Sequence, residues 1–216
     1  KAQAGMGIAA GDLDGDMRTD LFVTNFYLEA NNLYHNLGAM SFKDQALNAK
    51  LSMPSKLVLG FGAQAEDFDL DGDLDLLVAN GHIDNYSSRG DPWKMPTQLF
   101  RNLGDGTFED CSAAAGPYFA GMYLGRGVAT LDWNRDGRRD AIVVHQDQPA
   151  ALMENCTPMK SRGLLVRLVG RKTNRDAIGA KLRFSSNGRL QRRDFNGGDG
   201  FMATNERDFL IGVSEG

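Results

Sequence analysis

The chain has 216 residues, of which 42% are hydrophobic and 24% are charged, and its formal net charge is −4. These values are typical of an ordinary globular protein with one large or two small domains. No apolar run approaches the roughly 20 residues of a membrane span, so none is expected in this chain. No signal peptide opens the sequence, which begins almost inside a repeat, so we expect a fragment whose targeting segment lies upstream.

The charge is unevenly distributed along the chain. Residues 1–158 hold 12 Lys and Arg against 22 Asp and Glu, a net charge of −10, whereas residues 159–216 have a net charge of +6. Twelve of the 22 acidic residues lie in three short loops. The acidity therefore indicates a function of these loops and says little about a basic partner.

One pattern occurs three times between residues 5 and 157. Each copy has a glycine-spaced strand, an acidic loop, a short β-branched apolar strand and a third strand that ends in asparagine. The first two copies add a fourth strand. The expected strands are residues 5–10, 21–25, 32–36 and 41–44; 60–65, 76–80, 98–102 and 107–110; and 125–130, 141–145 and 151–155.

The turns that precede the two fourth strands differ in how strongly their sequences predict a hairpin. Asp105-Gly106 is a strong hairpin signal, whereas Ala39-Met40 is not, because neither residue favours the left-handed conformation of such turns. A longer connection, residues 81–96, separates two strands of the second copy and contains Trp93. Long loops on rigid scaffolds often carry function.

The acidic loop of the second copy, residues 67–75, has carboxylates at positions 1, 3, 5, 7 and 9 and Gly72 at position 6. The alternation aims several oxygens at one point, and glycine permits the sharp bend. Hard cations, above all Ca²⁺, suit such a cage; Mg²⁺ prefers a tighter octahedron, and no thiol or imidazole is placed for zinc. Three acidic surface turns are the alternative, but carboxylates this close repel each other unless a cation lies among them.

An EF-hand is the obvious competitor, and the sequence does not fit it. That motif needs a bidentate Glu at position 12, where the three loops have Val23, Val78 and Val143. Each loop also runs into a strand and not into a helix. We therefore predict loops that join two strands and hold one Ca²⁺ each, about three in total.

The repeats are offset by 55 and 65 residues. About four short antiparallel strands in a repeat of this length favour the blades of a β-propeller over a solenoid, whose repeats are usually shorter and more even. The predicted fold class is all-β, with about three four-stranded antiparallel blades of a partial propeller and a small β-domain after them.

Residues 5–157 resemble FG-GAP/VCBS repeats, the calcium-binding blades of integrin α-subunit propellers and of many bacterial surface proteins. The resemblance implies side-chain ligands at loop positions 1, 3, 5 and 9 and a backbone ligand at position 7. Met17, at position 6 of the first loop, departs from the glycine of the pattern. The implied metal ligands are Asp12, Asp14, Asp16, Arg18 and Asp20; Asp67, Asp69, Asp71, Asp73 and Asp75; and Asp132, Asn134, Asp136, Arg138 and Asp140.

A different pattern follows Pro158. Residues 163–170 indicate a strand, and Thr173-Asn-Arg-Asp-Ala-Ile-Gly-Ala180 fits the S/T-N-R-x-A-I-G-A pattern of the ASPIC/UnbV domain. We expect a calcium-binding propeller segment at residues 1–158 and an ASPIC/UnbV-like β-domain, shorter than the family pattern, at residues 159–216. Proteins that join these modules resemble the cartilage acidic protein family, which supplies no settled activity.

The leading hypothesis is an extracellular, cell-surface or periplasmic module that recognises a protein or glycan, with structural calcium. We expect it not to be an enzyme, since no catalytic constellation is visible. The alternatives are a propeller-based lyase or hydrolase with a site in the central tunnel, and an architectural spacer without a sizeable pocket.

Further features have two interpretations each. Arg167, Lys181 and Arg183 alternate with apolar residues, which favours a solvated face, or one that docks on the acidic blades, over nucleic-acid binding. Arg89-Gly90-Asp91 is the tripeptide of many integrin ligands and equally an ordinary turn. Cys111 and Cys156 fit no metal spacing; they either pair or remain two unpaired, small, buried residues.

Overall fold

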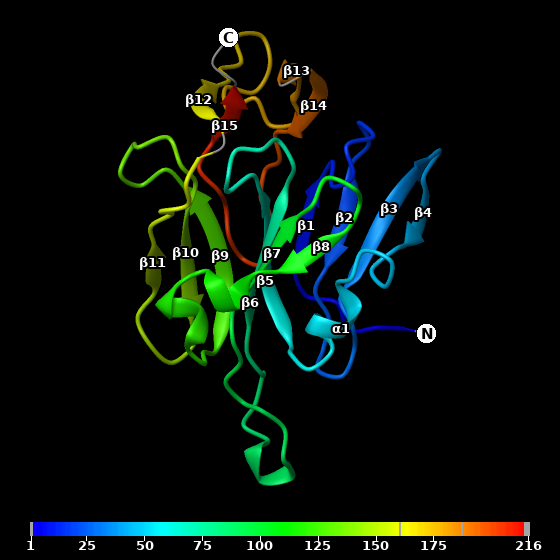
Figure 1. Cartoon of the computed structure of the whole chain (residues 1–216), viewed down its shortest axis with the longest axis vertical. Helices are drawn as coiled ribbons and strands as arrows, with labels where there is room; N and C mark the ends of the chain where they lie inside the picture. Colours follow the sequence, from blue (N-terminus) through cyan, green and yellow to red (C-terminus); the bar gives the residue numbers. More distant parts are fainter. Residues whose placement is uncertain (1, 160, 187, 214–216) are drawn as a thin grey trace.

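The computed structural model describes residues 2–159, 161–186 and 188–213. Three upright antiparallel sheets stand side by side, and the terminal strands lie across one end of them (Figure 1). The chain is nearly all-β, as predicted, and its helices are single turns: α1 (Ser52–Ser55), η1 (Ser87–Arg89), η2 (Ser112–Ala114) and η3 (Pro117–Ala120). Among the described residues, no helix is long and apolar enough to cross a membrane.

The three repeats form the three sheets, which we call blades 1, 2 and 3. Each blade is a meander in which consecutive strands pair. Blades 1 and 2 have four strands and blade 3 has three, which confirms the fourth strand in the first two copies alone. The strands are β1 (Ile8–Gly11), β2 (Asp20–Val23), β3 (Asn32–Gly38) and β4 (Ser41–Asp44); β5 (Gly60–Glu66), β6 (Asp75–Asn80), β7 (Gln98–Asn102) and β8 (Phe108–Asp110); and β9 (Gly125–Leu131), β10 (Asp140–His145) and β11 (Ala151–Met153).

The central blade is buried on both faces. All six residues of β6 are buried, and they alternate between two cores because successive side chains of a strand point to opposite faces. Leu76 and Val78 join the core between blades 1 and 2, whereas Leu77 and Ala79 join the core between blades 2 and 3. This explains why the segment reads as a continuous apolar run without a period of two.

The glycine-spaced strands are the innermost strands of the blades. A Cβ on Gly7 would lie 1.9 Å from the carbonyl oxygen of Phe61, and one on Gly62 would lie 2.5 Å from that of Arg126. Side chains this close to a neighbouring backbone are not tolerated, so the spacing of these glycines serves the approach of one blade to the next.

The weak turn signal at Ala39-Met40 is a tight hairpin in the structure. Both residues have positive φ, 49° and 60°, and they join β3 to β4. A two-residue turn of this handedness matches the twist of its strands, so the strand pairing holds non-glycine residues in the left-handed region.

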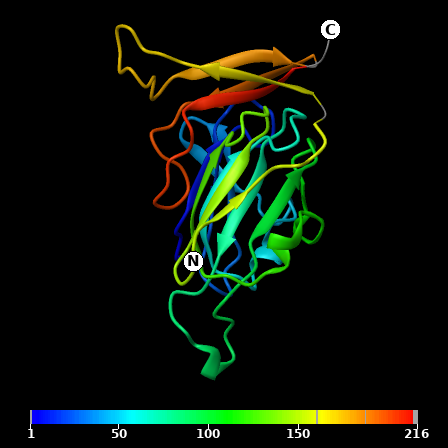
Figure 2. The ribbon, with the colours of Figure 1, turned by 90° about the vertical axis from the view of Figure 1, so that its left-hand side faces the viewer.

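After blade 3 the chain forms two small sheets of two strands, β12 with β15 and β13 with β14. They lie across the same end of all three blades (Figure 2). Lys160, at the predicted junction, lies outside the described residues. These strands are β12 (Arg162–Arg167), β13 (Lys181–Ser186), β14 (Arg189–Asp194) and β15 (Asp208–Val213).

The connection between β14 and β15 leaves the terminal sheets and runs down along the inner strands. Gly200 pairs with Ile8 of β1, and the Glu206 N–H donates to the Thr130 carbonyl of β9 at 2.8 Å. Phe201 stacks edge-on against Phe61 with ring centroids 5.1 Å apart. The connection between β14 and β15 therefore packs directly against the inner strands of the blades.

Residues 81–96 project from the opposite end of the blades (Figure 1). Their base is fixed, because the His82 N–H donates to the Trp93 carbonyl and Lys94 forms an ion pair with Asp147 at 2.6 Å. Between these contacts the loop is mostly exposed. Elsewhere, Cys111 and Cys156 are free cysteines, unpaired as the second alternative expected. Cys111 is half-buried and Cys156 is exposed, so the expectation that both are buried is wrong.

Candidate metal sites

The three acidic loops connect the first and second strands of the three blades, and they share one backbone conformation. Position 4 has positive φ in every loop, at Gly15, Leu70 and Arg135. So does position 6, at Met17, Gly72 and Gly137, with φ of 71°, 101° and 82°. Met17 therefore adopts the bend that glycine makes in the other two loops, and loop 1 keeps the same conformation despite the departure from the pattern.

The same hydrogen bonds close each loop. The position-6 N–H donates to the position-1 carboxylate: Met17 to Asp12 Oδ2 at 3.0 Å, and Gly72 to Asp67 Oδ2 at 2.9 Å. The position-5 and position-7 N–H groups donate to the Oδ1 atoms of positions 3 and 5 in all three loops. These bonds turn the side chains at positions 1, 3 and 5 toward the inside of the loop.

The carboxylate at position 9 ties each loop to its blade. In loop 2, Asp75 Oδ2 accepts the Phe68 N–H at 3.3 Å and Oδ1 accepts the Asn102 N–H at 2.8 Å. The equivalent bonds recur at Asp20 and Asp140. All three side chains are buried, so position 9 joins the loop to the third strand of its blade as well as facing the other carboxylates.

The structure brings the predicted carboxylates of loops 1 and 2 together. Oxygens of the side chains at positions 1, 3 and 5 lie within 4.8 Å of one another in both loops, so either group could hold a metal ion. Asp12 Oδ1 and Asp67 Oδ1 are buried, and neither has a hydrogen-bond partner in the described part of the chain. A buried carboxylate oxygen without a donor is costly, and a bound cation would satisfy it.

Burial changes the acidity of these groups. It raises the pKa of Asp67 to about 7, against an opposing effect of the Arg193 guanidinium, and it raises the pKa of Asp75 to about 8. In loop 1 burial raises the pKa of Asp20 to about 6. Neighbouring carboxylates raise all three further, so these loops are poor environments for negative charge without a counter-cation.

In blades 1 and 3, the residue before the asparagine that lies in or shortly after the third strand faces position 3 of the loop. In blade 1 this residue is His35, whose Nδ1 lies 2.8 Å from Asp14 Oδ2. The expectation that no imidazole is placed for zinc concerns loop 2 and does not extend to loop 1, because the pairing of β3 with β2 brings His35 to loop 1. In blade 3 it is Glu154, which accepts a hydrogen bond from Asn134 at 3.0 Å and supplies the carboxylate that position 3 lacks there.

The side chains at position 7 all form ion pairs, within the loop in loops 1 and 3 and with the terminal strands in loop 2. Arg18 pairs with Asp16, and Arg138 pairs with Asp136 at 2.7 Å. Asp73 instead forms a two-pronged ion pair with Arg189 of β14, at 2.7 and 2.9 Å. Each of these residues thus has its carbonyl and not its side chain to offer to an ion in its own loop.

The asparagines that end the third strands connect one blade to the next. Asn102 Nδ2 donates to the Leu13 carbonyl in loop 1 at 2.9 Å, and Asn155 Nδ2 donates to the Phe68 carbonyl in loop 2 at 2.8 Å. Leu13 and Phe68 both occupy position 2 of their loops. The following blade therefore holds the loop of the blade before it. The recurring asparagine is visible in the sequence, but the carbonyl that it contacts is not.

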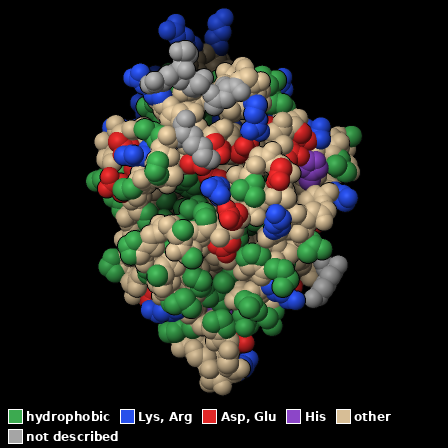
Figure 3. Space-filling model, viewed as in Figure 1, with side chains coloured by type: hydrophobic (Ala, Val, Ile, Leu, Met, Phe, Trp, Pro, Cys, Tyr) green, Lys and Arg blue, Asp and Glu red, His purple; other side chains and the backbone are tan. Residues whose placement is uncertain are grey.

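The end of the molecule that carries the loops is also the end that the terminal strands cover. On the face seen in Figure 3, most acidic side chains gather in the upper half, below these strands and among basic side chains. Arg192 donates to the Met17 carbonyl of loop 1 at 2.7 Å, and Arg193 Nη2 lies 3.4 Å from Asp67 Oδ2 of loop 2. The basic segment thus docks on the acidic blades through Arg192 and Arg193 of β14. Arg167, Lys181 and Arg183, from which the sequence predicted a solvated or a docking face, are exposed, so for these residues the solvated face holds.

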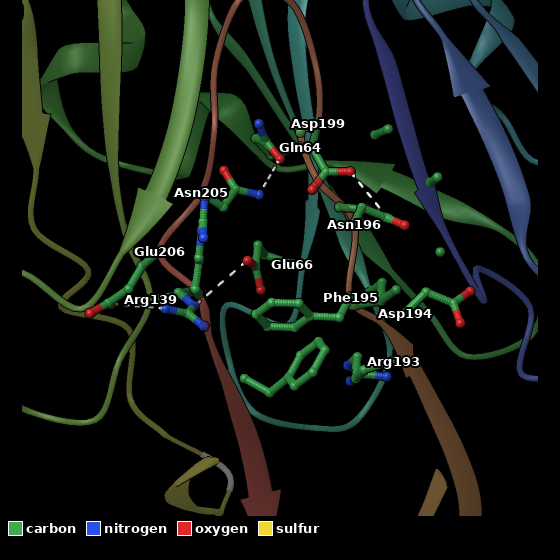
Figure 4. A pocket seen from close by; sticks show the side chains of 18 of the residues that line it. Gln64, Glu66, Arg139, Arg193, Asp194, Phe195, Asn196, Asp199, Asn205 and Glu206 are labelled. Carbon is green, nitrogen blue, oxygen red and sulfur yellow. Dashed lines mark hydrogen bonds and ion pairs between the residues drawn. The ribbon is translucent and has the colours of Figure 1, made fainter. Parts of the chain in front are cut away.

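A cavity of about 80 Å³ lies among the inner strands and the connection between β14 and β15 (Figure 4). Arg139 crosses it, 3.2 Å from Glu206 and 3.6 Å from Glu66. Asn205 donates to Gln64 at 2.7 Å. Burial raises the pKa of Asp199. The polar groups are largely bonded to each other, and the volume is well below the ~300–1,000 Å³ of typical ligand sites.

The fold and the loops define tandem antiparallel propeller-type blades with one acidic loop each and a terminal β-segment. Comparison with known families agrees. The model described as FG-GAP-like repeat matches residues 12–78 and 67–143, and the model described as ASPIC and UnbV matches residues 170–216. The chain belongs to the FG-GAP-like repeat family and carries an ASPIC and UnbV segment.

Curated relatives share this combination. The chain is 28% identical over 162 residues to cartilage acidic protein 1 of Homo sapiens, and equally to that of Mus musculus. Each of these matches covers 69% of this chain and 22% of the relative. It is 42% identical over 57 residues to cartilage acidic protein 1 of Xenopus tropicalis, 26% of this chain and 9% of the relative. The chain spans about a fifth of the length of the human and mouse relatives.

Proposed function

We propose that each of the three loops binds one Ca²⁺ ion and that the ions hold the blades in place as structural elements. The observation that carries the proposal is the threefold repetition of one loop geometry, with a buried and unpartnered oxygen at Asp12 and at Asp67. The proposed ligands are the side chains at positions 1, 3, 5 and 9 and the carbonyl at position 7, as the sequence predicted. The donors are oxygens throughout, which suits a hard cation.

Loop 1 has a property that the other loops lack. His35 stands beside Asp14 and Asp20, and ligand atoms of these three side chains lie within 4.8 Å of one another. Two carboxylates and an imidazole also suit transition metals, so loop 1 is the loop in which Ca²⁺ selectivity should be weakest.

The decisive experiment measures metal content and affinity in the same sample. Protein dialysed against equal concentrations of Ca²⁺, Mg²⁺ and Zn²⁺ should retain about three Ca²⁺ per chain, and Asp71→Ala should lose one. Glu109→Gln is the matched control, because Glu109 is an acidic residue in a surface ion pair with Arg101, outside the loops. Retention of zinc alone, or of no metal in the parent protein, would reject calcium as the ligand of these loops.

The second part of the proposal is that the chain belongs to an extracellular module for protein or glycan recognition. Calcium sites with millimolar-range affinity are filled outside cells, where calcium is plentiful. The relatives are named for cartilage, an extracellular tissue. A pocket of about 630 Å³, lined largely by apolar residues between blades 2 and 3, is more than a simple spacer needs.

The terminal strands cover the end of the blades that carries the loops, which leaves the opposite end for a partner. Residues 81–96 project there, and Ile83 at their base is 47% exposed. A screen of extracellular proteins and glycans should find a ligand whose binding is lost when residues 83–92 are replaced by a Gly/Ser linker. Loss of binding by Asp71→Ala, at a temperature at which this variant is still folded and with residues 83–92 unchanged, would place recognition at the metal loops instead.

The division into residues 1–158 and 159–216 is also a proposal. It is supported by the change from blades to separate two-stranded sheets after β11. Limited proteolysis with calcium present should cut near residues 157–161 or within residues 81–96 first. Early cleavage inside a metal loop would contradict the division.

A further inference from the structure

The terminal strands contact the metal loops at equivalent points. Arg192 Nη1 donates to the carbonyl of Met17 at 2.7 Å, and Arg193 Nη2 donates to the carbonyl of Gly72 at 3.3 Å. Met17 and Gly72 both occupy position 6, the residue with positive φ that closes its loop. Adjacent arginines of β14 thus reach the same atom of two neighbouring loops.

The other terminal sheet lies on loops 2 and 3 through two glycines. Gly163 of β12 and Gly212 of β15 face each other in the strand register. A Cβ on Gly163 would lie 2.5 Å from the carbonyl oxygen of Gly137, at position 6 of loop 3, and one on Gly212 would lie 2.3 Å from that of Leu70 in loop 2. The backbone of this sheet therefore rests directly on the loops, and every loop touches the terminal strands.

These contacts depend on the shape of the loops. Arg192, Arg193 and the glycines of β12 and β15 can contact the loop carbonyls only if those carbonyls have fixed positions. The positive φ angles at positions 4 and 6 set the loop conformation that fixes them. Arg192 and Arg193 each have side chains about one-tenth exposed, so their charges are largely removed from water. Arg192 is neutralised mainly by Asp194 at 2.8 Å, whereas Arg193 relies on loop 2 for its anionic partner, Asp67.

Loop 2 has enough negative charge for both the arginines and a cation. Its five aspartates give a charge of −5 when ionised, and the contacts with Arg189 and Arg193 leave −3. A divalent cation leaves −1, so the arginines do not need to displace it. The two oxygens of Asp67 are also divided: Oδ2 accepts the Gly72 N–H and faces Arg193, whereas Oδ1 is buried without a partner in the described residues.

We propose that calcium binding in loops 1 and 2 and docking of strands β12–β15 stabilise each other, with Arg193 as the main positioning residue of loop 2. A cation in the loop would fix the backbone that presents the Gly72 carbonyl, and Arg193 holds Asp67 through Oδ2, which leaves Oδ1, unpartnered among the described residues, for the cation. The inference rests on the proposed function, because it requires metal in the loops. Linkage makes the effect reciprocal: calcium strengthens docking by the factor by which docking strengthens calcium binding, typically 5–150-fold.

The test measures both sides of this linkage in the whole chain. Calcium affinity is obtained by titration, and docking by amide hydrogen exchange in β12–β15 with and without EGTA. Arg193→Met should weaken one of the calcium sites about 10-fold and accelerate exchange in β14. Arg183→Met is the matched control. Arg183 is exposed and lies opposite Arg192 in the strand register of β13 and β14, so the variant removes the same charge from the same sheet, but no hydrogen bond or ion pair to the loops in the described part of the chain. It should change calcium affinity less than 2-fold.

Asp73→Asn is a second variant, in case the loss of a buried arginine prevents folding. It weakens the exposed Arg189 contact and leaves the position-7 carbonyl in place. It should accelerate exchange in β14 at a given calcium concentration. If the parent protein binds calcium and both variants bind it equally well with unchanged exchange, this inference alone is rejected. Tighter calcium binding by Arg193→Met would show competition and overturn it. A parent protein that binds no calcium rejects the proposed function as well.

Discussion

The side chain of Asn102 hydrogen-bonds to both blade 1 and blade 2, so its removal tests how much this link between the blades contributes to stability. The side chain is 3% exposed. Its Nδ2 donates to the Leu13 carbonyl in blade 1 at 2.9 Å and to the Leu74 carbonyl in blade 2 at 3.1 Å, and its Oδ1 accepts the Gly104 N–H at 3.0 Å. Asn102→Ala removes all three bonds and leaves two buried carbonyls without this donor.

The expected cost follows from the number of groups left unpaired. A buried polar group that loses its partner costs about 1–3 kcal/mol, so two carbonyls predict a loss of about 2–6 kcal/mol in the free energy of unfolding. For a chain of this size each kcal/mol lowers Tm by roughly 2–4 °C, which predicts a decrease of roughly 4–24 °C. The effect should appear with calcium present, since the bond links two backbones.

Asn36→Ala is the control, because Asn36 occupies the same position in blade 1 but its Nδ2 donates to Thr19 of its own blade, at 2.9 Å. Urea unfolding of both variants at saturating calcium gives the comparison, and hydrogen exchange in β1 and β2 shows whether blade 1 loosens. Asn102→Ala leaves one more carbonyl without a donor than Asn36→Ala does, so it should lose about 1–3 kcal/mol more. Equal losses would refute the argument that the bond between blades matters.

Three further predictions concern the metal, the close approach of the inner strands at Gly62, and the ion pairs of the buried Arg139. EGTA should lower Tm by several degrees and calcium should restore it, because metal-free loops repel by several kcal/mol each; an unchanged Tm with verified metal loss would contradict a structural role. Gly62→Ala should cost about 3 kcal/mol in urea unfolding, since its Cβ would lie 2.5 Å from β9, whereas Gly127→Ala, with 3.3 Å to its neighbour, should cost less. Arg139→Ala should cost about 3–5 kcal/mol in urea unfolding, because Glu66 loses the buried guanidinium beside it, Glu206 keeps only its pair with the exposed Arg135, and the packing of the side chain is lost. Arg139→Met keeps most of the packing and should cost less. Equal losses by the two variants would show that packing contributes little.

The sequence by itself determined the blades and the loops, because their signals are local. Alternating aspartates with a bend between them and short β-branched strands on either side lie within about 15 residues of each other, so spacing alone predicted their arrangement. Even the departure at Met17 follows this rule, since hydrogen bonds within the loop impose its positive φ of 71°. The family resemblance rests on the same local patterns.

Tertiary structure decided everything that joins distant segments. His35 and Glu154 meet their loops only because a neighbouring strand brings them there, and Asn102 finds its partner 89 residues away in another blade. Arg189 meets Asp73 across 116 residues. Charge patterning could predict that basic strands dock on acidic blades, because attraction acts at long range. It could not predict which arginine meets which carbonyl, since that depends on how closely the glycines of the blades and of the terminal strands let their backbones approach.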